Sequence, residues 1–234
     1  MRFLFTVFAL AASLWAGPKE DLIAAADALM AKRSYAWTIK IEGGDFLEGP
    51  HKGRVDATGV VAYSMHFEDA DAEALIKGDH RLVKLHDGWK PATNFLGVRP
   101  LSGPPESVAR AAGIAIALKT PAEEGKVLAQ KLATLERSAD GGIAGPLTQE
   151  LVRELSHLRA ADGSRPQIEN VHGAATFYIT DGVLSRYKLK YSGLLKGRFG
   201  ELDLSRTDTF EISGAGATVV DLPPEALKIL DAKP

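Results

Sequence analysis

Alternation of apolar and polar side chains with a period of two constrains this chain more than any other feature of its sequence. The stretch from Tyr35 to Glu42 reads Tyr-Ala-Trp-Thr-Ile-Lys-Ile-Glu. Successive side chains of a β-strand point to opposite faces, so this pattern predicts a strand with one buried and one solvated face. Residues 61–67 and 183–192 follow the same rule. We therefore expect an antiparallel sheet with one polar face.

Turn signals join the expected strands into hairpins. The stretch 73–90 carries short apolar pieces separated by Gly78-Asp79 and closed by Asp87-Gly88, which predicts a meander. Asp181-Gly182 lies between the alternating stretches 171–180 and 183–192 and predicts a long two-stranded ribbon. On its outer face, Lys188 and Lys190 are expected to be solvated.

Two further segments complete the expected order of strands and loops. Residues 43–53 are rich in glycine and contain Pro50, so we expect a loop between two strands. Residues 203–212 are expected to form one more strand.

Helical spacing of apolar residues predicts helices between the strands. An opening amphipathic helix is expected over 19–32, where Pro18 is placed to start the first turn. The helices expected later in the chain cover 107–118, 121–132, 148–159 and a short closing stretch through Leu230, and a small hairpin is expected at 135–143. Acidic residues at the start of the third helix, Glu123 and Glu124, are placed where helix N-termini favour negative charge.

The first residues predict export. Met1-Arg2 supplies one positive charge, and residues 3–14 form an apolar run that is too short for a bilayer span of about 20 residues. We expect 1–16 to be a signal peptide that is cleaved after Ala16, with cleavage after Ser13 as the alternative. Residues 17–234 are then expected to form a single domain, without a transmembrane segment, in the periplasm or outside the cell.

Composition limits the chemistry. The chain has no cysteine, so the core alone must hold the exported fold, and thiol chemistry and zinc-thiolate sites are excluded. The formal net charge of -2 gives no reason to expect a nucleic-acid partner. We expect a monomer.

The order of these elements resembles the outer-membrane lipoprotein carrier (LolA-like) fold family. The resemblance covers nearly the whole chain after the signal: the opening helix, the aromatic strand from Tyr35, the strand ending Met65-His66-Phe67, the meander 75–85, the inserted helices, the terminal hairpin and the close at 222–226. It implies an α+β fold in which a strongly curved antiparallel sheet, an incomplete barrel, wraps around inserted helices and leaves an apolar cavity.

One constellation is singled out for function, an aromatic and aliphatic stripe on the inward sheet face. Its members are Tyr35, Trp37, Ile39, Tyr63, Met65, Phe67, Phe177, Tyr187 and Tyr191. A curved sheet presents such a stripe as one concave surface, which would line a cavity for an acyl chain or another apolar ligand. The same stripe would equally serve as the core on which the helices pack.

No catalytic or metal motif is present. His66 and Glu68 supply only two ligands, whereas zinc sites need three or four, and the acidic run 68–73 lacks the spacing of a calcium loop. Ser185 and Lys188 match a Ser-x-x-Lys pattern that works on a helix, but here they lie in an expected strand. We therefore expect neither a metal nor a cofactor.

The sequence leaves three functional hypotheses. The first is a non-enzymatic protein that binds a hydrophobic small molecule, lipid or lipidated protein on the concave sheet face. The alternative is an interaction or scaffold protein of the cell envelope with a filled core and no ligand. The third is a hydrolase assembled from dispersed His, Asp and Ser residues.

Overall fold

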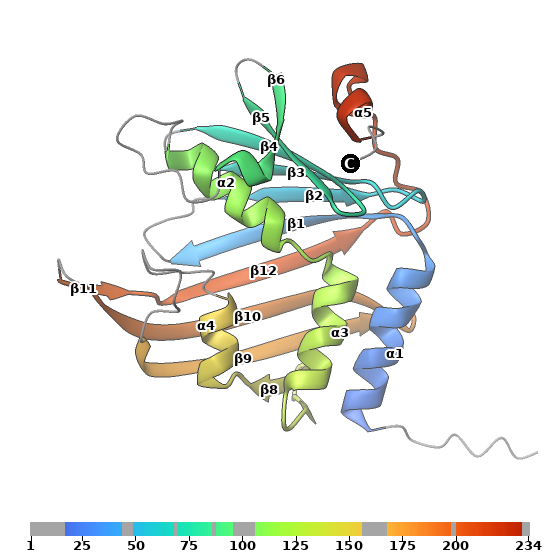
Figure 1. Ribbon diagram of the computed structural model, residues 1–234. Coiled ribbons are helices and arrows are strands. Elements are labelled where there is room, and N and C mark those ends of the chain that lie inside the picture. Colours follow the sequence, from blue (N-terminus) through green and yellow to red (C-terminus); the bar gives the residue numbers. More distant parts are fainter. Residues whose placement is uncertain are drawn as a thin grey trace, which may run out of the picture.

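The computed structural model confirms the α+β class and the curved, open sheet. It describes residues 17–43, 49–67, 70–85, 88–95, 106–155, 168–197 and 200–230. The expected signal peptide and its cleavage sites lie outside these residues. All described helices except the closing one, Pro224–Leu230, lie across one face of the sheet, which bends around them (Figure 1).

The sheet has 12 strands in the order β6-β5-β4-β3-β2-β1-β12-β10-β9-β8-β7, and β11 pairs with β10. The strands are β1 Tyr35–Gly43, β2 His51–Val55, β3 Val61–His66, β4 Asp71–Lys77, β5 His80–Leu85, β6 Gly88–Pro91, β7 Glu136–Arg137, β8 Ile143–Pro146, β9 Ile168–Thr180, β10 Val183–Gly197, β11 Gly200–Asp203 and β12 Arg206–Ser213. Neighbours along this path pair antiparallel, and among the described residues the edge strands β6 and β7 are not paired with each other. The sheet is therefore an incomplete barrel.

Strand β1 crosses the middle of the sheet and joins the two halves of the chain. It pairs with β2 on one side and with the late strand β12 on the other, where Ile39 lies opposite Phe210. Tyr35, Trp37 and Ile39 are buried while Lys40 is exposed, as the alternation predicts. The meander 73–90 is confirmed as β4, β5 and β6.

The expected loop 43–53 is wrong at both ends, because Gly43 belongs to β1 and residues 51–53 belong to β2. A side chain is not tolerated at the middle of this strand: a Cβ built on Gly53 would lie 2.0 Å from ring atoms of Trp37. The glycine that suggested a loop is thus a strand residue that makes room for a tryptophan. Residues 44–48 lie outside the described part.

The helices are α1 Pro18–Ala31, α2 Glu106–Ala117, α3 Pro121–Lys131, α4 Gln149–Leu155 and α5 Pro224–Leu230, with a 3-10 turn at Ala92–Phe95. Helix α3 begins with a capping box, in which Glu123 accepts hydrogen bonds of 2.8 Å from the backbone N–H and the hydroxyl of Thr120. The expected helix 148–159 is described only as far as Leu155.

The expected strand 203–212 is present with one interruption: Asp203 ends β11 and β12 begins at Arg206. Asp203 accepts hydrogen bonds from the backbone N–H and the hydroxyl of Ser205, at 2.8 and 2.6 Å, which forms a local turn. Leu204 donates its N–H to the carbonyl of Gly193. This turn interrupts the strand locally, but β11 and β12 keep one register against β10, with Leu194 opposite Asp203 and Tyr191 opposite Arg206.

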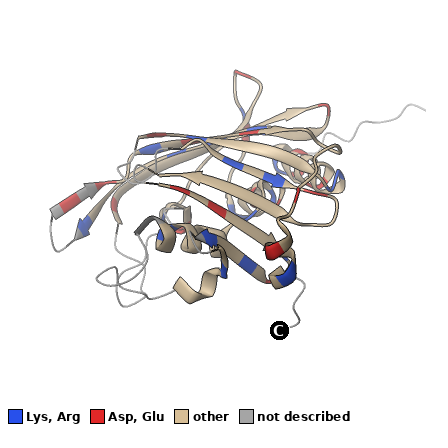
Figure 2. Ribbon diagram, turned by 90° about the horizontal axis from the view of Figure 1, so that it is seen from above, with Lys and Arg blue, Asp and Glu red and all other residues tan. Residues whose placement is uncertain are grey.

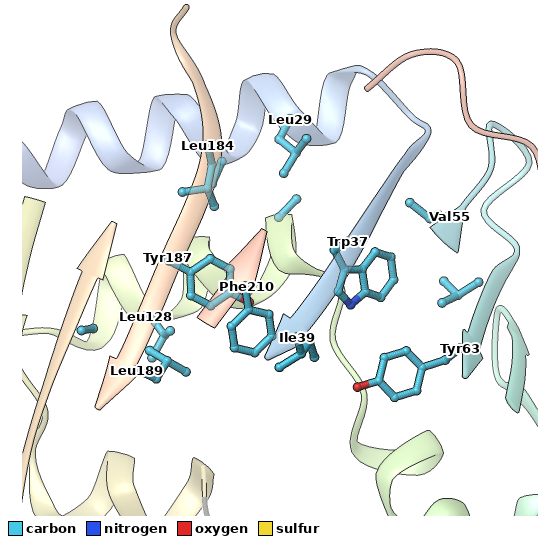
Figure 3. Packing of buried hydrophobic residues seen from close by; sticks show 14 of the residues in the cluster. Leu29, Trp37, Ile39, Val55, Tyr63, Leu128, Leu184, Tyr187, Leu189 and Phe210 are labelled. Atoms are coloured by element: carbon cyan, nitrogen blue, oxygen red, sulfur yellow. The ribbon is translucent and has the colours of Figure 1, made fainter. Parts of the chain in front are cut away.

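One large buried cluster lies between the concave face and helices α1 to α4. In Figure 3 the rings of Trp37, Tyr63, Tyr187 and Phe210 point into this space, and the Tyr187 and Phe210 rings stack with centroids 4.2 Å apart. The helices expected between the strands therefore supply the second layer of the core.

A smaller cluster lies on the other face of the sheet, where α5 packs against β4, β5 and β6. It contains Leu75, Leu82, Trp89, Ala226 and Leu230. Elsewhere acidic and basic residues are interspersed over sheet and helices (Figure 2). No helix of the described residues is both long and apolar enough to cross a membrane.

Candidate ligand-binding cavity

A cavity of about 130 Å³ lies between the concave sheet face and the helices. Its walls come from β1, β2, β3, β10 and β12 on the sheet side and from α2, α3, α4 and the linker between α2 and α3 on the other side. Aliphatic and aromatic side chains supply most of the lining: Ile39, Ile41, Ile114, Ala117, Leu118, Val127, Leu128, Leu151, Leu155, Leu189 and Phe210. Ala117 and Lys119 are exposed, so the cavity wall reaches the molecular surface at the α2–α3 linker.

A buried ion pair forms one polar part of this lining. Arg206 donates from Nε to Asp208 Oδ1 at 2.8 Å and from Nη2 to Oδ2 at 2.7 Å, a bidentate arrangement. The Asp208 residue is only 5% exposed. Burial raises the pKa of Asp208, and the charge of Arg206 opposes that shift. Both side chains face inward because residues 206, 208 and 210 of β12 share one face.

Glu124 lies across the cavity on α3. Tyr187 of β10 donates its hydroxyl to Glu124 Oε2 at 2.5 Å, which ties the helix to the sheet. Burial raises the pKa of Glu124 to about 7, while the hydrogen bond from Tyr187 acts in the opposite direction. The carboxyl group therefore carries a proton part of the time near neutral pH.

His51 lines the cavity from β2 and is 2% exposed. Its Nδ1 accepts a hydrogen bond of 3.1 Å from the backbone N–H of His66. In the neutral ring the proton then belongs to Nε2, which is buried and has no hydrogen-bond partner. Burial, with the nearby charge of Arg206, lowers the pKa of His51 to about 4, so the ring is neutral at pH 7.

Tyr63 of β3 completes the polar group. The residue is 3% exposed, and its hydroxyl has no hydrogen-bond partner among the described residues. Burial raises the pKa of this phenol, as do the charges of Glu124 and Asp208, while that of Arg206 lowers it. The polar lining thus converges from β2, β3, β12 and α3 around an otherwise apolar volume.

The nine residues singled out from sequence fall into two sets. Ile39 and Tyr63 line the cavity. The other seven are buried in the core around it: Tyr35, Trp37, Met65, Phe67, Phe177, Tyr187 and Tyr191. Tyr187 still contributes to the site through its hydrogen bond to Glu124.

Sequence reasoning missed Arg206, Asp208, Glu124 and His51. For β12 a signal was present, because Arg206 and Asp208 alternate in phase with the apolar Phe210 and so interrupt a buried face with charges. For α3 none was available. Glu123 and Glu124 both match the preference of helix N-termini, and only the packing separates the capping residue from the buried one.

The remaining candidate residues lie apart from the cavity. His66 Nδ1 is 2.6 Å from Asp71 Oδ1 on the exposed face of β3 and β4. Ser185 and Lys188 lie in strand β10, as the alternation predicts, and the Ser185 hydroxyl donates to the carbonyl of Tyr178. Among the described residues, no group of three His, Cys, Asp or Glu side chains is placed to hold a metal ion.

Fold and cavity together define a class of protein: an open, curved antiparallel sheet that encloses a small, mostly apolar cavity beneath helices. No protein-family model matches the sequence, and no curated protein matches it. Among solved structures, the crystal structure of LprF from Mycobacterium bovis is similar at 10% sequence identity and a TM-score of 0.46, over 88% of this chain and 96% of that chain. A likeness at this level adds nothing to the architecture described above.

Proposed function

We propose that this protein binds an apolar ligand, without catalysing a reaction on it, in the cavity between the concave sheet face and helices α2, α3 and α4. The observation that carries the proposal is the unfilled volume itself, whose walls are mainly aliphatic. A filled core would serve stability better, because empty space in a core forfeits dispersion contacts.

The size of the cavity limits what enters it in this state. A volume of about 130 Å³ is close to that of an engineered apolar cavity of about 150 Å³ that admits benzene, and below the roughly 300–1,000 Å³ of drug-sized pockets. One short alkyl segment fits. A full acyl chain, or a probe with three aromatic rings, requires α2, α3 or α4 to move away from the sheet.

Two alternatives fit the cavity less well. A scaffold protein with a filled core leaves this volume unexplained. A hydrolase of the serine, threonine or cysteine type needs that nucleophile in its site, and the described residues that line the cavity include none of the three. We also propose that residues 1–16 direct export and that binding takes place in the cell envelope, as the apolar run 3–14 indicates.

Binding of the neutral fluorophore N-phenyl-1-naphthylamine tests the cavity. Val127 of α3 lines the cavity and is partly buried, so Val127→Phe fills part of the volume. We expect this variant to bind the fluorophore at least tenfold more weakly than the native chain. The matched control is Ile23→Phe on α1, where a partly buried aliphatic residue contacts the same core but does not line the cavity.

Three outcomes are informative. Weakened binding in Val127→Phe alone supports the cavity as the binding site. Equal weakening in both variants, at equal thermal stability, would point to a general loss of packing and contradict the proposal. Absence of fluorophore binding to the native chain at micromolar concentration would also contradict it.

A further inference from the structure

We propose that the polar lining of the cavity recognises a neutral hydrogen-bond acceptor on the ligand, such as the carbonyl oxygen of an ester or amide, and discriminates against a carboxylate or phosphate at that position. This inference rests on the proposed function, because it assigns the head group of the same apolar ligand. It comes from the balance of donors, acceptors and charges among the buried lining residues.

Hydrogen-bond donors outnumber free acceptors here. The Tyr63 hydroxyl has no partner among the described residues, and the buried Nε2–H of His51 has none either. Arg206 uses Nε and Nη2 for Asp208, and no hydrogen bond joins its Nη1 to a described residue. Buried donors of native proteins are nearly always paired, so this surplus points to an acceptor supplied from outside the chain.

The acceptors of the lining are largely engaged within the protein. Both carboxylate oxygens of Asp208 accept from Arg206. Oε2 of Glu124 accepts from Tyr187, and the carboxyl group retains a proton part of the time near pH 7. A ligand that brings a donor therefore finds few acceptors, whereas one that brings a carbonyl finds several donors.

The charges argue against an anionic head group. Arg206 and Asp208 cancel each other, His51 is neutral at pH 7, and Glu124 adds between zero and one negative charge. An added carboxylate or phosphate would lack a buried compensating cation among the described residues, which is costly. Two other charged residues line the cavity: Lys119 is exposed where the wall reaches the surface, and Glu154 is partly buried and pairs with Lys131.

The test compares three probes of similar length: methyl octanoate, sodium octanoate and nonane. Each displaces N-phenyl-1-naphthylamine from the full chain at pH 7.5, and its dissociation constant follows from the competition. We expect methyl octanoate to bind about tenfold more tightly than either of the others, because only this probe offers an acceptor without a charge.

Tyr63→Phe removes one oxygen and keeps the ring that stacks on Trp37. We expect it to weaken methyl octanoate binding about five- to tenfold and to leave nonane binding unchanged. Tyr35→Phe is the control, since Tyr35 is equally buried on the same sheet face but lies outside the cavity lining. As a second readout, the infrared carbonyl band of carbon-13-labelled methyl octanoate should shift to lower frequency on binding in the native chain, and less in Tyr63→Phe.

The outcomes separate this inference from the function on which it rests. If the native chain binds methyl octanoate more tightly than the other two probes, and Tyr63→Phe loses this difference, the head-group inference is supported. Equal binding of ester and nonane overturns the head-group inference but leaves apolar binding intact, and tightest binding of octanoate overturns the preference for a neutral group. If none of the probes binds, the proposed function fails as well.

Discussion

At the scale of single residues, Gly53 shows how tightly the central strands pack. Its place on β2 is opposite Trp37 on β1, and a methyl group there would meet the indole ring. Trp37 is 2% exposed. The local composition suggests a loop, but the requirement at this position comes from a neighbouring strand.

Gly53→Ala should therefore destabilise the protein by about 3 kcal/mol through overpacking. The control is Gly113→Ala in α2, where a Cβ would meet nothing within 4 Å and where alanine favours a helix by about 0.5–1 kcal/mol. Urea unfolding measures both changes. A Gly53→Ala variant as stable as the native chain would contradict the packing of β1 on β2.

The second prediction concerns Glu124 and the pH dependence of the free energy of unfolding. Its pKa rises from an ordinary 4.5 to about 7 on folding, so the folded state holds the proton more tightly. Stability associated with this group is complete below pH 4.5 and is lost as the pH rises to about 7. Glu124→Gln should match the native chain near pH 4.5 and exceed its stability by about 1–3 kcal/mol at pH 8.

Urea unfolding at pH 4.5, 6 and 8 tests this difference. His51 acts in the opposite sense, because its pKa is lowered to about 4 and its contribution is lost as the pH falls below 6.5, so the native profile alone is expected to be shallow. Glu123→Gln is the control, since Glu123 caps the same helix at the surface. A stability difference between Glu124→Gln and the native chain that is the same at all three pH values would refute a partly buried Glu124 with a raised pKa.

At the scale of secondary-structure elements, α5 is the described helix that packs apolar side chains on the outer face of β4, β5 and β6. Ala226 is fully buried against this face, while its neighbour Leu227 is 36% exposed. The adjacent positions therefore differ in burial within the same helical turn.

Ala226→Asp should weaken the docking of α5 and cost about 2 kcal/mol or more, because a carboxylate would be placed against Leu75 and Trp89. Leu227→Asp should cost less than about 0.5 kcal/mol. Thermal melting compares the two variants. Equal melting temperatures would show that α5 does not pack as described.

The strands and hairpins could be predicted from sequence because each depends on local signals, alternation within a strand and the turn at its end. The long hairpin around Asp181-Gly182 is an example, and its turn uses positive φ at both residues. Alternation alone did not predict the interruption between β11 and β12, because it depends on a side-chain turn in which Asp203 accepts from Ser205 while both strands keep one register against β10. The cavity could not be predicted either, because it depends on packing. Ile39 belongs to the apolar stripe that the sequence indicates, but no local pattern tells whether the helices fill the space between that stripe and themselves.

At the scale of the whole molecule, every described wall of the cavity lies after residue 16. A chain that lacks residues 3–14 should therefore fold and bind N-phenyl-1-naphthylamine as the mature chain does, but it should remain in the cytoplasm. Cell fractionation and fluorophore titration check the two statements separately. Failure of the shortened chain to fold would assign the apolar run to the domain instead of to export.

The central claim is that the molecule holds an apolar ligand beneath its helices. Its most direct test is mass spectrometry of an organic extract from protein that was exported in a host with intact membranes and purified without detergent. We expect a neutral, ester- or amide-containing lipid in stoichiometric amount, and less of it in Val127→Phe. An extract without lipid, from protein that also fails to bind N-phenyl-1-naphthylamine, would contradict the account.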